Sequence, residues 1–132
     1  MRLCLLIAGA GFFVNVFTVP SNGAVFYTIY YALSAVSMAG INSALTNLVF
    51  DYVAPATRSN ALAVSQAVSG VAGFVTTLVV SGLVTYIQDS GNTLFGLPVY
   101  AQQVVSAIAF VFTMAAVLYV TLVIIPVRGK KK

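Results

Sequence analysis

The 132-residue sequence has very few side chains that ionise near neutral pH. It contains no histidine, one cysteine (Cys4) and two acidic residues (Asp51 and Asp89), and only 6% of its residues are charged. Acid–base catalysis and metal binding need clusters of titratable or metal-ligating side chains, and one cysteine excludes an internal disulfide. The sequence therefore predicts no enzyme, no metal site and no cofactor.

Apolar residues take the place of the missing charges. They make up 61% of the chain, whereas an ordinary soluble domain is about half apolar and about a quarter charged. A chain of this length has no core large enough for so much apolar surface, so we expect it to lie in a lipid bilayer. Its six basic residues lie at the edges of the apolar runs and are too few to indicate a nucleic-acid partner.

Four apolar segments are long enough to cross a membrane, since about 20 helical residues span a hydrocarbon core of about 30 Å. They cover residues 3–19, 24–49, 60–87 and 99–127. They lack the alternation of membrane strands, and backbone groups in lipid must bond internally, so helices are expected. The sequence predicts an all-α polytopic membrane protein, with one transmembrane domain over 1–132 and a basic tail at 128–132.

The basic residues predict the orientation of these four spans. Four spans place both termini and the loop 51–59 on one side of the membrane. That side holds every base of the chain: Arg2, Arg58, Arg128, Lys130, Lys131 and Lys132. The connections at 20–23 and 88–98 contain none. The positive-inside rule then places the termini and the loop 51–59 in the cytoplasm, and we expect an integral protein of a bacterial cell membrane.

The loop 51–59 has the composition of a tight turn. Pro55 biases Ala54 away from helix and ends the second span. Asp51 lies near the negative end of that span, where an acid is locally unfavourable, and Arg58 or a partner's cation would offset it. A solvated loop with a weak surface pair is the equally open alternative.

The third span carries a stripe of small residues. Residues spaced by four form it: Ser65, Ser69, Gly73, Thr77 and Ser81, with Gln66, Gly70 and Gly82 beside them. Small residues let helix backbones approach closely in lipid. The stripe therefore indicates a packing face for another helix, and a cavity-lining face is the alternative.

The second span has a related polar face, and the outer spans do not. Its polar and small residues are Ser34, Ser37, Gly40, Asn42, Ser43, Thr46 and Asn47. Asparagine in a span is costly unless it finds a partner or water, so these residues indicate helix packing or contact with a solute. The first span has one polar residue deep in its run, Asn15, and the last is mostly apolar, so we expect both to be peripheral.

Taken together, these features resemble the C-terminal end of a major facilitator superfamily transporter. The resemblance lies in a helix with Gly and Asn on one face, the stretch "DYVAPATRSNALAVSQAVSGVAGF", an apolar last helix and the tail "RGKKK". The pattern P-x-x-R-S-x-A, from Pro55 to Ala61, is similar to that family's loop between helices ten and eleven. The resemblance covers the whole chain, as helices nine to twelve of a twelve-helix fold.

This resemblance implies roles for individual residues. The family binds its substrate near the midplane between two halves built from three-helix repeats. The implied cavity residues are Asn42, Thr46, Asn47, Gln66 and Ser69. The implied interface between halves contains Ser65, Ser69, Gly70, Gly73, Thr77 and Ser81, and the implied cytoplasmic gate or loop contains Asp51, Pro55 and Arg58.

A full transporter of this family has eight further helices, so the resemblance implies a fragment, a truncated reading frame or one piece of a split protein. The expected partners are the lipid bilayer, the remaining helices and a small-molecule substrate. The alternative is a four-helix membrane subunit or oligomeric exporter that is complete in itself. Small multidrug resistance exporters carry a Glu in their first helix, and this sequence has none there.

Overall fold

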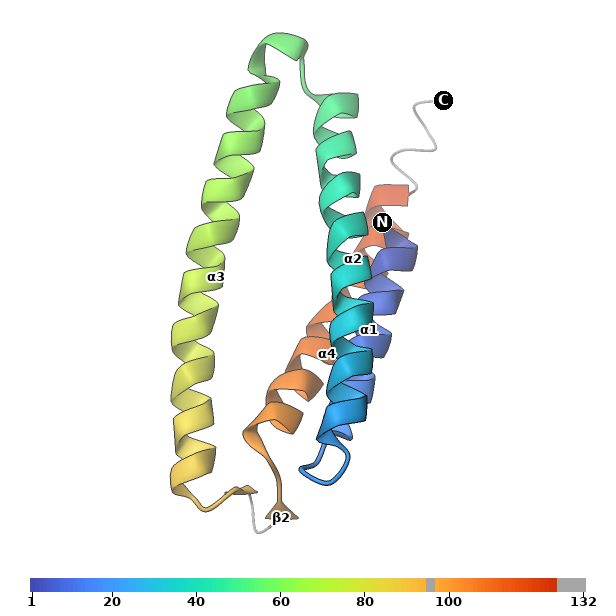
Figure 1. Ribbon diagram of the computed structural model, residues 1–132. Coiled ribbons are helices and arrows are strands. Elements are labelled where there is room, and N and C mark those ends of the chain that lie inside the picture. Colours follow the sequence, from blue (N-terminus) through green and yellow to red (C-terminus); the bar gives the residue numbers. More distant parts are fainter. Residues whose placement is uncertain (95–96, 126–132) are drawn as a thin grey trace. The chain divides into compact units, whose positions relative to one another are not determined.

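The structure, a computed structural model, describes residues 1–94 and 97–125 and is built from four helices. These are α1 (Arg2–Val16), α2 (Gly23–Tyr52), α3 (Arg58–Asp89) and α4 (Ala101–Tyr119), which continues as a π-helix, Val120–Ile124 (Figure 1). A 3-10 turn, Pro55–Thr57, precedes α3. The strands β1 (Thr93–Leu94) and β2 (Leu97–Pro98) lie between α3 and α4. The prediction of an all-α fold with four helices is confirmed, apart from this short hairpin.

Three of the helices are long and apolar enough to cross a membrane. They are α2, α3 with its preceding turn, and α4 with its π-helix. Helices α2 and α3 contain 30 and 32 residues, about 45 and 48 Å at a rise of 1.5 Å per residue. Both extend a few residues beyond the predicted 24–49 and 60–87. The last predicted segment, 99–127, begins as a helix at Ala101, and its final two residues lie outside the described part of the chain.

Helix α1 is shorter than the predicted segment 3–19. Its 15 residues span about 22 Å, less than a hydrocarbon core of about 30 Å. It ends at Val16 because a turn stabilised by Asn22 begins there. The Val19 amide donates to Asn22 Oδ1 at 2.8 Å, and Asn22 Nδ2 donates to the Phe17 carbonyl at 3.2 Å.

The chain forms two compact units, and each is described by itself. Unit 1 contains α1, the part of α2 up to Ile41, and α4 from Gln102. Unit 2 runs from Asn42 to Ala101 and contains the end of α2, the turn, α3 and the strands. One continuous helix, α2, therefore contributes to both units.

Glycines let α1 pack closely against two helices of unit 1. A Cβ on Gly9 would collide with Met114 Cε of α4, and a Cβ on Gly11 would lie 3.3 Å from Leu33 Cβ of α2. The Cys4 side chain of α1 occupies the space beside Gly40 of α2. Helix α1 is thus in contact on two sides. Its small residues form a packing face within unit 1, and its peripheral place in a larger fold stays a prediction.

A polar cluster joins α1 to α4 in the same unit. Asn15 Nδ2 donates to Ser106 Oγ at 2.7 Å, and Asn15 Oδ1 accepts from Gln102 Nε2 at 2.8 Å and from Thr18 Oγ1 at 3.1 Å. Asn15 and Ser106 are each 4% exposed. The Asn15 carbonyl oxygen therefore accepts two hydrogen bonds and one of its two side-chain N–H groups donates one, as expected for a buried amide.

In unit 2, the end of α3 turns into the hairpin. Gly91 and Asn92 have φ angles of 69° and 57°, a left-handed conformation that Gly and Asn adopt most readily. The strands pair antiparallel, with Thr93 opposite Pro98. This hairpin lies in the connection predicted as the loop 88–98, and its short strands were not anticipated.

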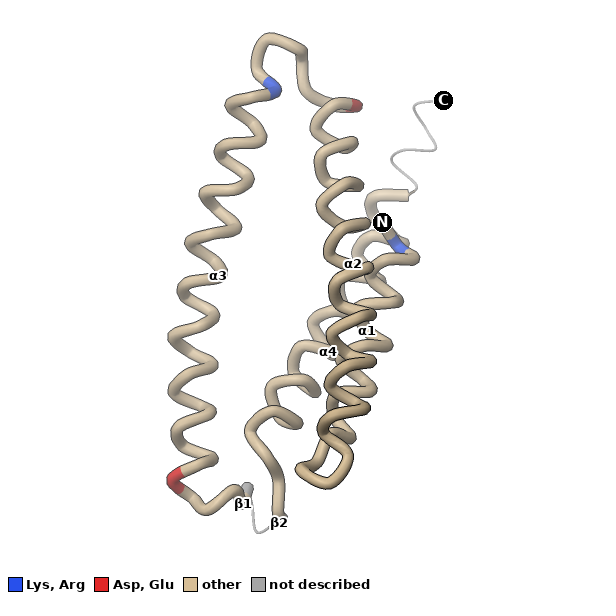
Figure 2. The backbone as a smooth tube through the Cα atoms, viewed as in Figure 1, with Lys and Arg blue, Asp and Glu red and all other residues tan. Residues whose placement is uncertain are grey.

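Charges in unit 2 lie at helix ends. Arg58 begins α3 and Asp89 ends it, and Asp51 lies in the last turn of α2 (Figure 2). Between Arg58 and Asp89 the helix has no Lys, Arg, Asp or Glu. The charge distribution is thus typical of a helix whose middle lies in hydrocarbon.

Candidate functional site

The turn between α2 and α3 has the conformation that its proline predicts. Ala54 has φ −58° and ψ 141°, an extended conformation outside the helical region, and Pro55 opens the 3-10 turn. A residue before proline avoids helix because the proline ring crowds its backbone. Helix α2 ends at Tyr52, so the predicted effect of Pro55 on the chain is confirmed.

Arg58 ties this turn to the end of α2. Its Nε donates to the Val53 carbonyl at 3.1 Å and its Nη2 donates to the Phe50 carbonyl at 2.9 Å. The guanidinium also lies 5.0 Å from the centre of the Phe50 ring. The last carbonyls of a helix lack partners within the helix and carry partial negative charge. Arg58 therefore acts as a cationic cap of α2.

The residues predicted for a cytoplasmic gate thus lie in one turn. Pro55 sets its backbone and Arg58 fastens it, while Asp51 is exposed in the last turn of α2. Sequence reasoning considered Arg58 as a counter-charge for Asp51. It did not find the bonds to backbone carbonyls, because these depend on how the chain folds back over five to eight residues.

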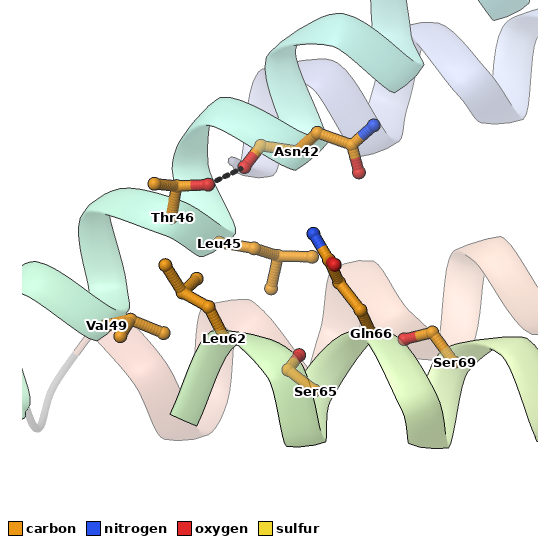
Figure 3. A pocket seen from close by; sticks show the side chains of 8 residues that line it. All are labelled: Asn42, Leu45, Thr46, Val49, Leu62, Ser65, Gln66 and Ser69. Atoms are coloured by element: carbon orange, nitrogen blue, oxygen red, sulfur yellow. Dashed lines mark hydrogen bonds between the residues drawn. The ribbon is translucent and has the colours of Figure 1, made fainter. Parts of the chain in front are cut away.

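A pocket of about 380 Å³ lies between the end of α2 and the start of α3, within unit 2. Eight side chains line it, four from each helix: Asn42, Leu45, Thr46 and Val49 from α2, and Leu62, Ser65, Gln66 and Ser69 from α3 (Figure 3). These positions follow the i, i+3, i+4, i+7 spacing, which places them on one face of each helix. Val49 lies three residues before the end of α2 and Leu62 lies four residues after the start of α3, so the pocket is close to the turn.

Two carboxamides give the pocket most of its hydrogen-bonding capacity. Within the described part of the chain, no hydrogen bond links the side chains of Asn42 and Gln66 to another group. The Gln66 amide extends from α3 toward α2, as Figure 3 shows. Thr46 differs, since its hydroxyl donates to the Asn42 carbonyl at 3.0 Å. The two free amides together offer four N–H donors and two carbonyl acceptors.

The structure brings together most of the residues predicted for a cavity. Asn42, Thr46, Gln66 and Ser69 all line the pocket, and Asn47 does not. Asn47 follows Thr46 directly, so its side chain is turned about 100° around the helix axis from that of Thr46. Whether a substrate occupies the pocket stays a prediction.

The pocket also has lining residues that sequence reasoning assigned elsewhere or missed. Ser65 was predicted only for the packing stripe, and Leu45, Val49 and Leu62 were not singled out. Their spacing from the polar residues was a usable signal. In a membrane span, however, an aliphatic residue suits lipid as well as a pocket, so spacing alone does not separate the two.

The small-residue stripe of α3 divides into two parts. Ser65 and Ser69 line the pocket, whereas Gly70, Gly73, Thr77 and Ser81 lie outside its lining, and all six residues are exposed. A Cβ added to Gly70 or Gly73 would meet no described atom within 4 Å. The Thr77 hydroxyl donates to the Gly73 carbonyl at 2.9 Å within the helix. Packing of another helix on this part of the stripe stays a prediction.

The described residues contain no group of three or more metal-ligating side chains. Comparisons with protein-family models, curated proteins and solved structures gave no match for this chain.

Proposed function

We propose that the four helices belong to a secondary active transporter of the major facilitator type, which moves a small solute across the membrane by alternating access. The observation that carries the proposal is the pocket between α2 and α3, which places uncharged polar side chains between two long apolar helices. Solute sites in such transporters lie between helices and are lined by side chains that project inward from them.

Energetics support a solute or water in this pocket. An amide surrounded by hydrocarbon without a hydrogen-bond partner costs several kcal/mol. Asn42 and Gln66 have no such partner in the described chain, and both face the same space. A hydrated cavity that admits a polar solute removes this cost for both residues at once.

The resemblance in the turn supports the family. The P-x-x-R-S-x-A pattern from Pro55 to Ala61 lies where the helix pair reverses direction, as the resemblance implies. The proposal places this turn, both termini and the basic tail on the cytoplasmic side of a bacterial membrane, and it treats 1–132 as part of one transmembrane domain. It assigns no catalytic residue, metal or cofactor to the chain.

The proposal is tested by the size of the protein in its native membrane. An antibody raised against the peptide VRGKKK should detect a band of about three times the mass of this chain, because the family fold has twelve helices. Removing the peptide by carboxypeptidase treatment should abolish the signal, which checks that the antibody is specific. A band at 13.8 kDa would contradict a twelve-helix polypeptide.

A four-helix membrane subunit or oligomer is the second candidate, and the exposed stripe favours it. Gly70 and Gly73 leave room for another backbone on α3. We predict that Gly73→Leu weakens association with whatever helix packs there by about tenfold, because a leucine prevents close backbone approach. Energy transfer between labelled copies in lipid vesicles would measure association of the chain with itself.

Val71→Leu is the matched control for this substitution. Val71 is also on α3 and is 65% exposed, but it lies about 160° around the helix axis from Gly73. It should leave association unchanged. If Gly73→Leu and Val71→Leu behave alike, the stripe is not a packing face between copies, and the second candidate loses its support.

A further inference from the structure

None of the eight described residues that line the pocket between α2 and α3 carries a charge, since they include no Lys, Arg, Asp or Glu. Arg58, the charged residue that begins α3, donates two hydrogen bonds to the carbonyls of Phe50 and Val53. Moving a charged solute from water to a low-dielectric site is very costly without an opposite charge. These eight residues therefore favour an uncharged solute over a cation or an anion.

The polar groups of the pocket suit a solute that both donates and accepts hydrogen bonds. The amides of Asn42 and Gln66 each offer donors and an acceptor, and the hydroxyls of Ser65 and Ser69 can do either. A solute that satisfies these side chains needs hydrogen-bond donors and acceptors a short distance apart. A chain or ring of hydroxyl groups has this property, because each hydroxyl donates once and accepts twice.

The apolar part of the lining is aliphatic. Leu45, Val49 and Leu62 are its three apolar members, and no aromatic side chain is among the eight. Flat aromatic solutes are usually held by stacking on aromatic rings, which this lining lacks. Aliphatic side chains instead suit the C–H surface of a saturated carbon skeleton. The volume of about 380 Å³ lies in the range of small-molecule sites.

From these three features we infer that the pocket binds an uncharged aliphatic solute with several hydroxyl groups, the chemical class of sugars and sugar alcohols. The inference deepens the proposed function and rests on it, since it takes the pocket as part of a solute path. Its residues have distinct parts: Asn42 and Gln66 hydrogen-bond the hydroxyls, and Leu62 contacts the carbon skeleton.

A cysteine placed in the pocket tests this binding without requiring transport. The cysteine is introduced by Ser69→Cys in a Cys4→Ser background, in membrane vesicles containing the full chain, and its rate of alkylation by a water-soluble maleimide is measured. Glucose should slow alkylation about tenfold at a concentration about ten times its dissociation constant, because the unoccupied fraction falls as 1/(1 + [L]/Kd). Glucosamine, glucuronate and cyclohexanol at the same concentration should slow it less than twofold.

Two further variants separate binding in the pocket from other effects. Gln66→Leu should raise the glucose concentration needed for protection about tenfold, because a hydrogen-bonding partner is lost. Val71→Cys places the cysteine at an exposed position of α3 outside the pocket lining, and glucose should not change its alkylation rate. Circular dichroism of each variant confirms that the helices remain.

The possible results distinguish the inference from the proposed function. Equal or better protection by glucosamine or glucuronate, or no protection by glucose, overturns the inference on solute class. Uptake of radiolabelled glucose into the same vesicles is measured separately. Protection without uptake supports the binding inference and counts against transport of glucose, whereas uptake of glucose without protection at Ser69→Cys supports transport and overturns the assignment of glucose to this pocket.

Discussion

Asn15→Leu should lower the free energy of unfolding by about 2 kcal/mol, because it removes three hydrogen bonds from a buried cluster. Ser106 loses its donor, and Gln102 and Thr18 lose their acceptor. Ser106 is 4% exposed, so water does not readily replace the lost bond. The polar groups left behind cost more than the bonds themselves contributed. Unfolding by sodium dodecyl sulfate in mixed micelles, followed by circular dichroism, measures the change.

Two other substitutions show whether the loss of stability in Asn15→Leu comes from the hydrogen-bonded cluster. Ser106→Ala removes one partner of Asn15 and should cost about 0.6 kcal/mol, a typical value for one hydrogen bond between membrane helices. Thr113→Val removes a hydroxyl of α4 that donates to the Ala109 carbonyl one turn away within the same helix, and should be nearly neutral. Equal effects of Asn15→Leu and Thr113→Val would show that the cluster does not hold α1 to α4.

Arg58→Met should loosen the turn between α2 and α3 by about 1 kcal/mol, which corresponds to about fivefold faster hydrogen exchange in residues 50–60. Methionine keeps an unbranched side chain but has no donor for the carbonyls of Phe50 and Val53, which Arg58 now bonds. The attraction between the guanidinium and the Phe50 ring is lost as well. Exchange followed by mass spectrometry measures the effect directly.

Arg58→Lys separates the charge from the shape of the side chain. Lysine keeps the positive charge beside the end of α2 but lacks the planar fork that bonds two carbonyls together. We expect an intermediate exchange rate. A rate equal to that of the unchanged protein would mean that charge alone stabilises the turn, and the two hydrogen bonds would then contribute little.

Local chemistry explains why the turn was predictable from the sequence. Proline restricts the residue before it whatever the rest of the fold does, so Pro55 indicated the end of α2 without further information. The polar residues of the pocket were predicted as cavity residues through the family resemblance, and their composition alone indicated only helix packing or contact with a solute. An asparagine or glutamine in a membrane span stands out against its apolar surroundings, and helical spacing shows which of them share a face.

Contacts between distant residues were not predictable in this way. Asn15 and Ser106 are 91 positions apart, and nothing in either neighbourhood indicates the other. The glycines of α1 illustrate the same point. Small residues indicate close packing, and four-residue spacing indicated the stripe on α3. In the structure Gly9 and Gly11 of α1 have close neighbours, whereas Gly70 and Gly73 have none within 4 Å among the described residues.

The length of α3 has a consequence for how water reaches the pocket. Its 32 residues make an upright helix about 18 Å longer than a hydrocarbon core of about 30 Å. For an upright helix this excess, shared equally, leaves about 9 Å beyond the hydrocarbon core at each end, in and past the headgroup layer. Gln66 lies about 12 Å along the helix from Arg58, so its amide is only about 3 Å below that layer. Water would then reach Gln66 from the membrane surface without a continuous channel, while Ser69, about 4.5 Å farther along the helix, lies deeper in the hydrocarbon core.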